Sequence, residues 1–280
     1  MKNQHKKVWL VTGASQGFGL ALVKYLLSKN EFVVATTRDP DKIAATGLSD
    51  ENLKIVKLDI TSESDVKNVT ELIIKTYGEI DVLVNNAGFG FVGAIEEASP
   101  EEIEQVFAIN VLATLRMIRA VMPTMRTAKK GHIINLSSIA GLAASAGIGI
   151  YNLAKHAVEG LSEALYAEAK PLGIKVTLIE PGMFRTGFYG NSLMVSKNSI
   201  ADYDETVGKI KKMFTSLGGN QPGNPDLAAK AIFDVVESET PPLRLLLGKD
   251  AYARAMKKMD DNKAEFERMQ SVTFSTDYKD

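Results

Sequence analysis

The chain has 280 residues, 45% hydrophobic and 24% charged, a composition typical of a globular protein with a sizeable core. Its 33 Lys and Arg are balanced by 34 Asp and Glu, which argues against nucleic acid as a partner. The lack of cysteine excludes disulfides, thiolate metal sites and a cysteine nucleophile. We expect a cytoplasmic protein without a membrane partner, because no segment reads as a transmembrane span or a secretory signal.

Short runs of β-branched residues alternate along the chain with longer segments of helical periodicity. Strands are expected at residues 7–11, 32–36, 54–58, 82–84, 132–136, 175–179 and 243–247. Helices are expected at residues 17–28, 64–77, 100–126, 151–171, 225–237 and 251–270. These repeated βαβ units predict an α/β fold of the Rossmann type: a doubly wound, mostly parallel seven-stranded sheet with helices on both faces.

A glycine-rich turn follows the first expected strand and opens the first expected helix. Glycines at such a junction let the backbone approach a pyrophosphate, and the free N–H groups of the helix start attract its negative charge. The spacing is Gly-x-x-x-Gly-x-Gly, unlike the Gly-x-Gly-x-x-Gly of the general dinucleotide fingerprint. Taken alone, the turn could equally serve packing. Its candidate cofactor-binding residues are Gly13, Ser15, Gln16, Gly17, Phe18 and Gly19.

Further polar residues follow the third and fourth expected strands, at the edge where open α/β sheets bind ligands. Asp59, next to Ile60, is placed to accept a hydrogen bond from an adenine amine, although helix capping is the alternative. Asn86, Ala87 and Gly88 follow the fourth strand, and the two small residues allow a cofactor ribose to lie close to the backbone.

With Asn110, Ser138, the pair Tyr151-x-x-x-Lys155, and Pro181-Gly182 with Thr186, the sequence resembles the classical short-chain dehydrogenase/reductase family over almost its whole length. The resemblance implies a nicotinamide-dependent oxidoreductase. It implies that Ser138 positions the substrate oxygen, Tyr151 exchanges the proton, and Lys155 binds the nicotinamide ribose. The resemblance further implies that Asn110 supports a water-linked proton path. Tyr151, Lys155, Pro181, Gly182 and Thr186 are also expected to contact the cofactor.

The chemistry of these residue types agrees with the implied roles. A free phenol has a pKa of about 10, which is high for proton exchange at neutral pH. Lys155 lies four residues after Tyr151 on the same helical face, so its charge is expected to favour the tyrosinate. Ser138, after the fifth strand, can donate a hydrogen bond to a developing oxyanion.

The end of the second expected strand indicates which nicotinamide cofactor is used. Thr37 stands where an acidic residue would bind the ribose 2′-hydroxyl of NAD, and Arg38 offers a guanidinium to the 2′-phosphate of NADP. A solvent-facing Arg38 is the alternative. Gln16 replaces the second basic residue that many NADP-preferring relatives carry. We therefore predict NADP(H) as the cofactor, with NAD(H) possible.

Residues 1–280 are expected to form a single domain, with the cofactor-binding part in about residues 1–150. Residues 183–224, rich in Gly, Ser, Asn and Met, are interpreted as a substrate-binding lid, with a mobile surface insertion as the alternative. Residues 275–280 are expected to be disordered. The expected substrate pocket comprises Phe89, Phe91, residues 142–146, Met183, Phe184, Phe188 and Tyr189.

This mostly apolar pocket predicts an uncharged, hydrophobic ketone, aldehyde or secondary alcohol as substrate. No metal site is expected, because the three histidines are scattered. A non-catalytic, NADP(H)-sensing regulatory protein is the alternative function. A sugar-nucleotide epimerase or dehydratase would carry a different glycine spacing. The resemblance also implies a homo-oligomer, a dimer or tetramer formed through the helices at 100–126 and 151–171.

Overall fold

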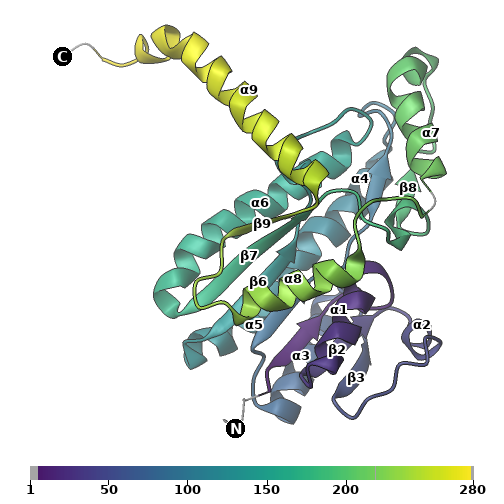
Figure 1. Ribbon diagram of the computed structural model, residues 1–280, viewed down its shortest axis with the longest axis vertical. Coiled ribbons are helices and arrows are strands. Elements are labelled where there is room, and N and C mark those ends of the chain that lie inside the picture. Colours follow the sequence, from purple (N-terminus) through teal and green to yellow (C-terminus); the bar gives the residue numbers. More distant parts are fainter. Residues whose placement is uncertain (1–5, 218, 279–280) are drawn as a thin grey trace.

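A parallel sheet forms the centre of the computed structural model, which describes residues 6–217 and 219–278 (Figure 1). Within these residues seven strands follow the order β3-β2-β1-β4-β6-β7-β9, and every neighbouring pair is parallel. The strands are β1 (Val8–Val11), β2 (Phe32–Thr37), β3 (Leu53–Lys57), β4 (Val82–Asn85), β6 (Gly131–Leu136), β7 (Ile174–Pro181) and β9 (Arg244–Leu247). All seven expected strands are confirmed.

Helices cover both faces of this sheet. On one face α1 (Gly17–Ser28) packs with α8 (Pro225–Glu237), and on the other lie α3 (Glu63–Tyr77), α5 (Ala113–Ala128) and α6 (Gly149–Ala169). The remaining α-helices of the described residues are α2 (Asp41–Ala44), α4 (Pro100–Phe107), α7 (Lys209–Ser216) and α9 (Lys249–Phe274). The doubly wound, Rossmann-type α/β fold predicted from the sequence is therefore confirmed.

Side-chain caps fix where several helices begin. Ser62 Oγ accepts a hydrogen bond from the backbone N–H of Asp65 (3.2 Å) at the start of α3. Ser99 and Glu102 form a reciprocal capping box before α4, and Asn224 caps α8. Because these caps satisfy N–H groups that have no partner inside the helix, they place the helix starts firmly at the edge of the sheet.

The helix expected at residues 100–126 extends to Ala128 in the structure and is interrupted by a π-helical turn. Five residues of π-helix, Ala108–Leu112, separate α4 from α5. By length and mean hydropathy, the whole span Pro100–Ala128 is apolar enough to cross a membrane. In the fold, its side chains Met117, Val121 and Met125 are buried against the sheet, as expected for a core helix.

A second, two-stranded sheet was not expected from the sequence. β5 (Gly90–Val92) pairs in parallel with β8 (Leu193–Val195), which joins the loop after β4 to the segment at 183–224. Three residues are too few for a periodic signal, so these strands could not be read locally. At the C-terminus, α9 continues past the expected residue 270 to Phe274, residues 275–278 follow it, and 279–280 lie outside the described residues.

A buried chain of amides and hydroxyls ties the central strands to α6. Asn85 Nδ2 donates to Asn135 Oδ1 (2.8 Å), and Asn135 Nδ2 donates to Ser162 Oγ (2.8 Å), which in turn donates to the carbonyl of Val158 (2.7 Å). Asn135 and Ser162 are fully buried. Because buried polar groups must be paired, this chain sets the position of α6 relative to β4 and β6.

Substitution of Asn135 tests this chain. Asn135→Ala leaves the amide of Asn85 without its acceptor, so we expect the free energy of unfolding to fall by about 2 kcal/mol in urea denaturation. Asn68→Ala, on the exposed face of α3, is the control and should change it by less than about 0.5 kcal/mol. Equal losses in the two variants would contradict this account.

Candidate active site

The glycine turn between β1 and α1 is held against the loop after β4. Thr12 Oγ1 accepts hydrogen bonds from the backbone N–H groups of Asn86 (3.0 Å) and Ala87 (3.1 Å), and Asn86 Nδ2 donates to the carbonyls of Thr12 and Gly13. Gly13 has φ of 63°, and a Cβ there would lie 2.8 Å from Ala87 Cα. A Cβ on Gly19 would lie 2.5 Å from Asn86 Nδ2. The close approach of the two loops therefore requires glycine at both positions.

The first turn of α1 is open to an anion. Its N-cap residue, Gln16, makes no side-chain hydrogen bond to the helix, and the first turn contains no acidic residue. Gln16 Nε2 instead donates to Ser192 Oγ (2.6 Å), in the segment predicted as a lid. The N–H groups and the dipole at this helix start fit a phosphate group.

Charged side chains gather where β2 and β3 end. Asp59 is exposed, and its carboxylate accepts hydrogen bonds from the backbone N–H (2.9 Å) and the hydroxyl (2.7 Å) of Thr61. These bonds, followed by the charge of Arg38, lower the pKa of Asp59.

Two basic side chains line the cleft at the end of β2. Arg38 is exposed next to Thr37, and Lys42 lines the same end of the cleft. Lys42 is a second basic residue at this position that the sequence analysis missed.

Ser138, Tyr151 and Lys155 meet where β6 and α6 face each other. Ser138 follows β6 in extended conformation, and its Oγ accepts a hydrogen bond from the backbone N–H of Ala140 (3.1 Å). Tyr151 lies in the first turn of α6, and its phenol is close enough to the Ser138 side chain for that side chain to lower the pKa of the phenol. Lys155 lies one turn further along α6, with its Nζ 5.7 Å from the centre of the Tyr151 ring and donating to the carbonyl of Leu136 (2.7 Å).

Asn110 lies at the centre of the π-helical turn, behind these residues. Its Oδ1 accepts from the backbone N–H of Phe89 (2.9 Å), and its Nδ2 donates to the Phe89 carbonyl (2.9 Å). A Cβ on Gly88 would lie 2.8 Å from Asn110 Oδ1 and 3.9 Å from Lys155 Nζ. Asn110 therefore fixes the loop after β4 beside the ammonium of Lys155.

Burial dominates the protonation of Tyr151 and Lys155. It raises the pKa of Tyr151, against the lowering effect of the Ser138 side chain, so the phenol stays protonated. Burial also lowers the pKa of Lys155 to about 8, opposed by the charge of Glu159 one turn away. The sequence-based expectation that Lys155 lowers the pKa of Tyr151 is therefore not met, because both groups are removed from water and the ammonium bonds to Leu136 instead of the phenol.

Almost all the predicted site residues line one cleft of about 1210 Å³. These are Gly13, Ser15, Gln16, Gly17, Phe18, Arg38, Asp59, Ile60, Asn86, Ala87, Gly88, Ser138, Tyr151, Lys155, Pro181, Gly182 and Thr186. Gly19 and Asn110 lie behind the wall of the cleft, where their contacts hold its loops together. Within residues 6–217 and 219–278, no three His, Asp or Glu side chains are grouped to hold a metal ion.

Aromatic rings continue from Tyr151 into the predicted lid. Phe188 lies 5.6 Å from the Tyr151 ring, Tyr189 lies 5.2 Å from Phe188, and Phe214 of α7 lies 5.2 Å from Tyr189, measured between ring centres. The expected pocket was wrong in one part, since only residues 145–146 of the expected stretch 142–146 line the cleft. Leu142 packs instead in the cluster at the base of α9.

The base of α9 forms a further wall that the sequence analysis missed. Asp250 Oδ2 accepts a hydrogen bond from the backbone N–H of Met183 (2.8 Å). Arg254 lines the cleft and donates to the carbonyl of Ala143 (2.6 Å) and to Ser145 Oγ (2.8 Å). More than sixty residues separate α9 from Met183, so no local pattern in the sequence could reveal these contacts.

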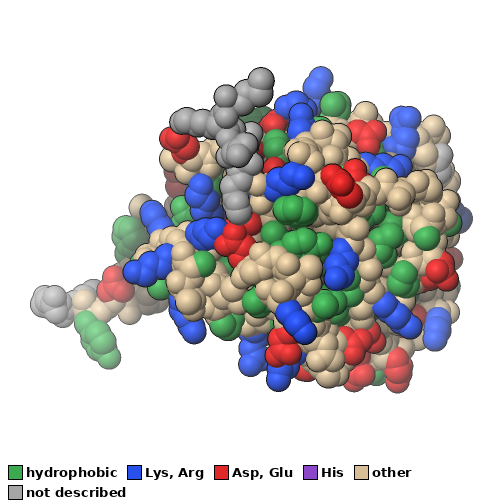
Figure 2. Space-filling model, turned by 90° about the horizontal axis from the view of Figure 1, so that it is seen from below, with side chains coloured by type: hydrophobic (Ala, Val, Ile, Leu, Met, Phe, Trp, Pro, Cys, Tyr) green, Lys and Arg blue, Asp and Glu red, His purple; other side chains and the backbone are tan. Residues whose placement is uncertain are grey.

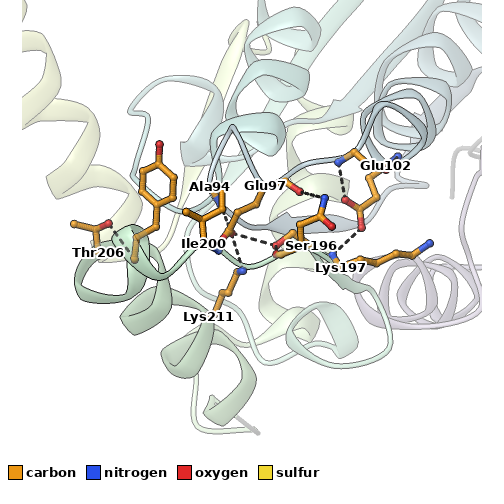
Figure 3. Close-up of polar contacts among 11 residues, drawn as sticks. Ala94, Glu97, Glu102, Ser196, Lys197, Ile200, Thr206 and Lys211 are labelled. Carbon is orange, nitrogen blue, oxygen red and sulfur yellow. Dashed lines mark hydrogen bonds and ion pairs between the residues drawn. The ribbon is translucent and has the colours of Figure 1, made fainter.

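The predicted lid is fastened to the body by Glu97, which precedes α4 (Figure 3). The buried Glu97 carboxylate accepts hydrogen bonds from the backbone N–H groups of Ala94 and Ile200 (both 2.9 Å) and pairs with Lys211 Nζ of α7 (2.7 Å). Burial raises the pKa of Glu97, but the bonds from Lys211 and the two N–H groups outweigh it and lower the value to about 2. Glu102 also accepts from the N–H of Lys197 (3.0 Å).

The fold and this cleft define the class of the protein as a nucleotide-binding oxidoreductase, and comparisons with known proteins identify the family. The sequence matches the short chain dehydrogenase family over residues 7–193. A 3-ketodihydrosphingosine reductase from Bacteroides thetaiotaomicron is 34% identical over 266 residues, covering 93% of this chain and 96% of that protein. The chain therefore belongs to the short-chain dehydrogenase/reductase family.

Solved structures agree with this assignment. The crystal structure of a short-chain dehydrogenase from Streptomyces avermitilis is 36% identical, with a TM-score of 0.91, and covers 98% of this chain and 100% of that chain. The closed form of a serine dehydrogenase complexed with NADP+ is 27% identical, with a TM-score of 0.74, and covers 86% of this chain and 94% of that chain.

The bonds of Glu97 lead to a prediction for the lid segment. Glu97→Gln removes the charge that holds Lys211, so we expect residues 183–224 to be cut faster in limited proteolysis at pH 7, and the free energy of unfolding to fall by at most about 3 kcal/mol. Because the folded pKa is lowered, this contribution is complete above about pH 4.5 and is lost as the pH falls towards 2.

The control is Glu96→Gln. In the wild-type protein the Glu96 carboxylate accepts an exposed hydrogen bond from the Tyr203 hydroxyl. It should leave the rate of proteolysis nearly unchanged. If the wild-type protein and Glu97→Gln differ as much at pH 3 as at pH 7, the ion pair does not fasten the lid.

Proposed function

We propose that this protein transfers a hydride between NADP(H) and an uncharged, hydrophobic ketone or aldehyde, or the corresponding alcohol. The observation that carries the proposal is the placement of Tyr151: its buried phenol lies beside Ser138, Lys155 lies one turn away, and its ring contacts Phe188 of the predicted lid. This placement supports Tyr151 as the proton donor to a substrate held in the apolar pocket.

The residues of the cleft fit a nicotinamide dinucleotide. The open start of α1 suits the pyrophosphate, and the close packing of Gly13 and Gly19 leaves the turn free of side chains. Gly88, next to Asn110 and Lys155, leaves room for a ribose, which Lys155 can bind. When bound, the cofactor supplies or accepts the hydride.

The side chains supply the proton and hold the substrate. Ser138 can donate its hydroxyl hydrogen to the substrate oxygen, and Tyr151 delivers the proton as negative charge develops there. Burial favours the protonated phenol, which is the form needed to reduce a carbonyl. Lys155, with a pKa of about 8, carries its charge at neutral pH, so its ammonium can donate to a ribose that lies beside Gly88. Asn110 keeps the adjoining loop in place.

The preference for NADP(H) rests on the charges at the end of β2. Thr37 leaves the tip of β2 without a carboxylate. Arg38 and Lys42 line the cleft, as does Asp39, whose carboxylate pairs with Lys42 Nζ (3.8 Å). A 2′-phosphate would find two cations here, whereas the 2′-hydroxyl of NAD gains little from them. The serine dehydrogenase to which the chain is similar binds NADP+.

The apolar character of the substrate rests on the aromatic rings between Tyr151 and α7. We propose that residues 183–224 close over this pocket as a lid, fastened through Glu97, and that residues 1–280 act as one catalytic unit whose cofactor part is about 1–150. The name of the Bacteroides relative, a reductase of 3-ketodihydrosphingosine, agrees with a hydrophobic keto substrate. A non-catalytic NADP(H) sensor would bind cofactor equally well and show no turnover.

Removal of the Tyr151 hydroxyl tests the catalytic assignment. With NADPH and a panel of hydrophobic ketones, Tyr151→Phe should lose about 100- to 10,000-fold in kcat because the proton donor is missing, while NADPH binding followed by fluorescence stays within about threefold. Tyr189→Phe, whose phenol also lines the cleft, is the matched control and should keep most of the activity. Near-normal turnover of Tyr151→Phe would refute the assignment.

Replacement of Arg38 tests the cofactor preference. Arg38→Ala removes a cation from the proposed 2′-phosphate site, so the ratio of kcat/KM with NADPH to that with NADH should fall about tenfold or more. Lys42→Ala should lower the ratio in the same direction by a smaller factor. Arg126→Ala, exposed at the end of α5, should leave it unchanged. An unaltered ratio in Arg38→Ala would contradict the predicted NADP preference.

A further inference from the structure

The C-terminal helix α9 stands away from the body of the molecule (Figures 1 and 2). Only its first turns are fixed to the fold, because Ala251 and Ala255 are its only buried residues among those described. At about 1.5 Å per residue, the 26 residues of Lys249–Phe274 span about 39 Å. A long part of the helix therefore has no neighbour among the other described residues of its own chain.

This free part of α9 carries an apolar stripe. Tyr252, Met259 and Phe266 recur at intervals of seven residues, and Met269 follows Phe266 by three. Met259 is 64% exposed and Phe266 is 70% exposed. A repeat of seven places these side chains along one seam of a helix, which is the pattern of helices that pair with another helix. Single exposed apolar residues are common, but a stripe along a projecting helix is costly unless something covers it.

We propose that α9 of one molecule pairs in antiparallel fashion with α9 of a second copy. In the register that we infer, Met259 of each copy lies opposite Asn262 of the other copy. Phe266 of each copy then lies at the same height along the helix pair as Met256 of the other copy. The contact is two-fold symmetric, so each interaction occurs twice. This surface is separate from α5 and α6, through which the family resemblance implies assembly, and the proposal does not depend on the proposed enzymatic function.

The charges beside the stripe select this arrangement. In the proposed register, the flanking Lys258 of each copy lies opposite Glu265 of the other. Lys258 forms no ion pair among the described residues, and Glu265 has only a 3.9 Å contact with Arg268. Both side chains are therefore free to form the two symmetric ion pairs between copies.

Two other arrangements bring like charges together. An antiparallel pair shifted outward by seven residues would place Glu265 opposite Glu265 and Lys263 opposite Lys263. A parallel pair would place Lys258 opposite Lys263. Like charges at such flanking positions are unfavourable, so charge complementarity favours the antiparallel register centred between Met259 and Asn262.

Disulfide trapping tests the geometry directly, because the chain has no cysteine of its own. Met259→Cys and Asn262→Cys are prepared as separate proteins and oxidised alone and as an equimolar mixture. The antiparallel register predicts that a disulfide-linked dimer forms chiefly in the mixture and contains one copy of each variant. Linkage mainly in the separate proteins, or equally low linkage in all three samples, would overturn the proposal.

Charge exchange tests the register independently. Lys258→Glu and Glu265→Lys should each weaken the association of two α9 helices about tenfold, as measured by sedimentation, and should lower the yield of the mixed disulfide-linked dimer. The double exchange should restore both. Lys257→Glu, which lies away from the seam, should have little effect. Helix content by circular dichroism checks that all variants fold. Failure of the double exchange to restore pairing would refute the register.

Discussion

All strands of the main sheet run in the same direction, and the active-site cleft depends on this constraint. Parallel strands end at one edge, and the order β3-β2-β1-β4-β6-β7-β9 reverses between β1 and β4, where the connecting helices change face. The loops after β1, β4, β6 and β7 therefore converge although they are far apart in the sequence. The glycine turn, the loop of Asn86, Ser138 and Pro181 line one cleft for this reason.

Burial then gives the converging side chains their chemical character. Lys155 is only 6% exposed, and its ammonium is held by the carbonyl of Leu136 and favoured by the charge of Glu159. The same removal from water keeps the phenol of Tyr151 protonated. One turn along α6 from Lys155, Glu159 pairs with Arg244 of β9 (3.2 Å), while burial and the charge of Glu159 raise the pKa of the neighbouring Glu180 to about 8. The fold thus places charges in its interior where they act on the catalytic groups at short range.

Local sequence signals were sufficient for the main sheet, its covering helices and the site motifs. Each of these depends on periodicity or on a short motif at a strand end, as with the turn at Gly13 or the pair Tyr151 and Lys155. Distant contacts were not predictable in this way. Arg254 and Asp250 reach the cleft from α9, and β5 pairs with β8 across about a hundred residues.

The pKa values of the buried groups could not be predicted from the sequence either. The spacing of Tyr151 and Lys155 correctly indicates that they share a helical face, but it does not show how deeply both are buried. Burial raises the pKa of the phenol where the spacing alone suggested a lower value. In the same way, Lys42 became a candidate for the 2′-phosphate site only when the end of β2 and the start of α2 were seen to line one cleft.

Hydride transfer in this cleft can be measured directly by isotope labelling. NADPH carrying deuterium on the transferable position of its nicotinamide would be incubated with the protein and a panel of hydrophobic ketones, and the alcohol products analysed by mass spectrometry. We predict that one deuterium appears on the former carbonyl carbon of at least one product. NADPH binding without deuterium in any product would contradict the account and favour a cofactor-sensing protein.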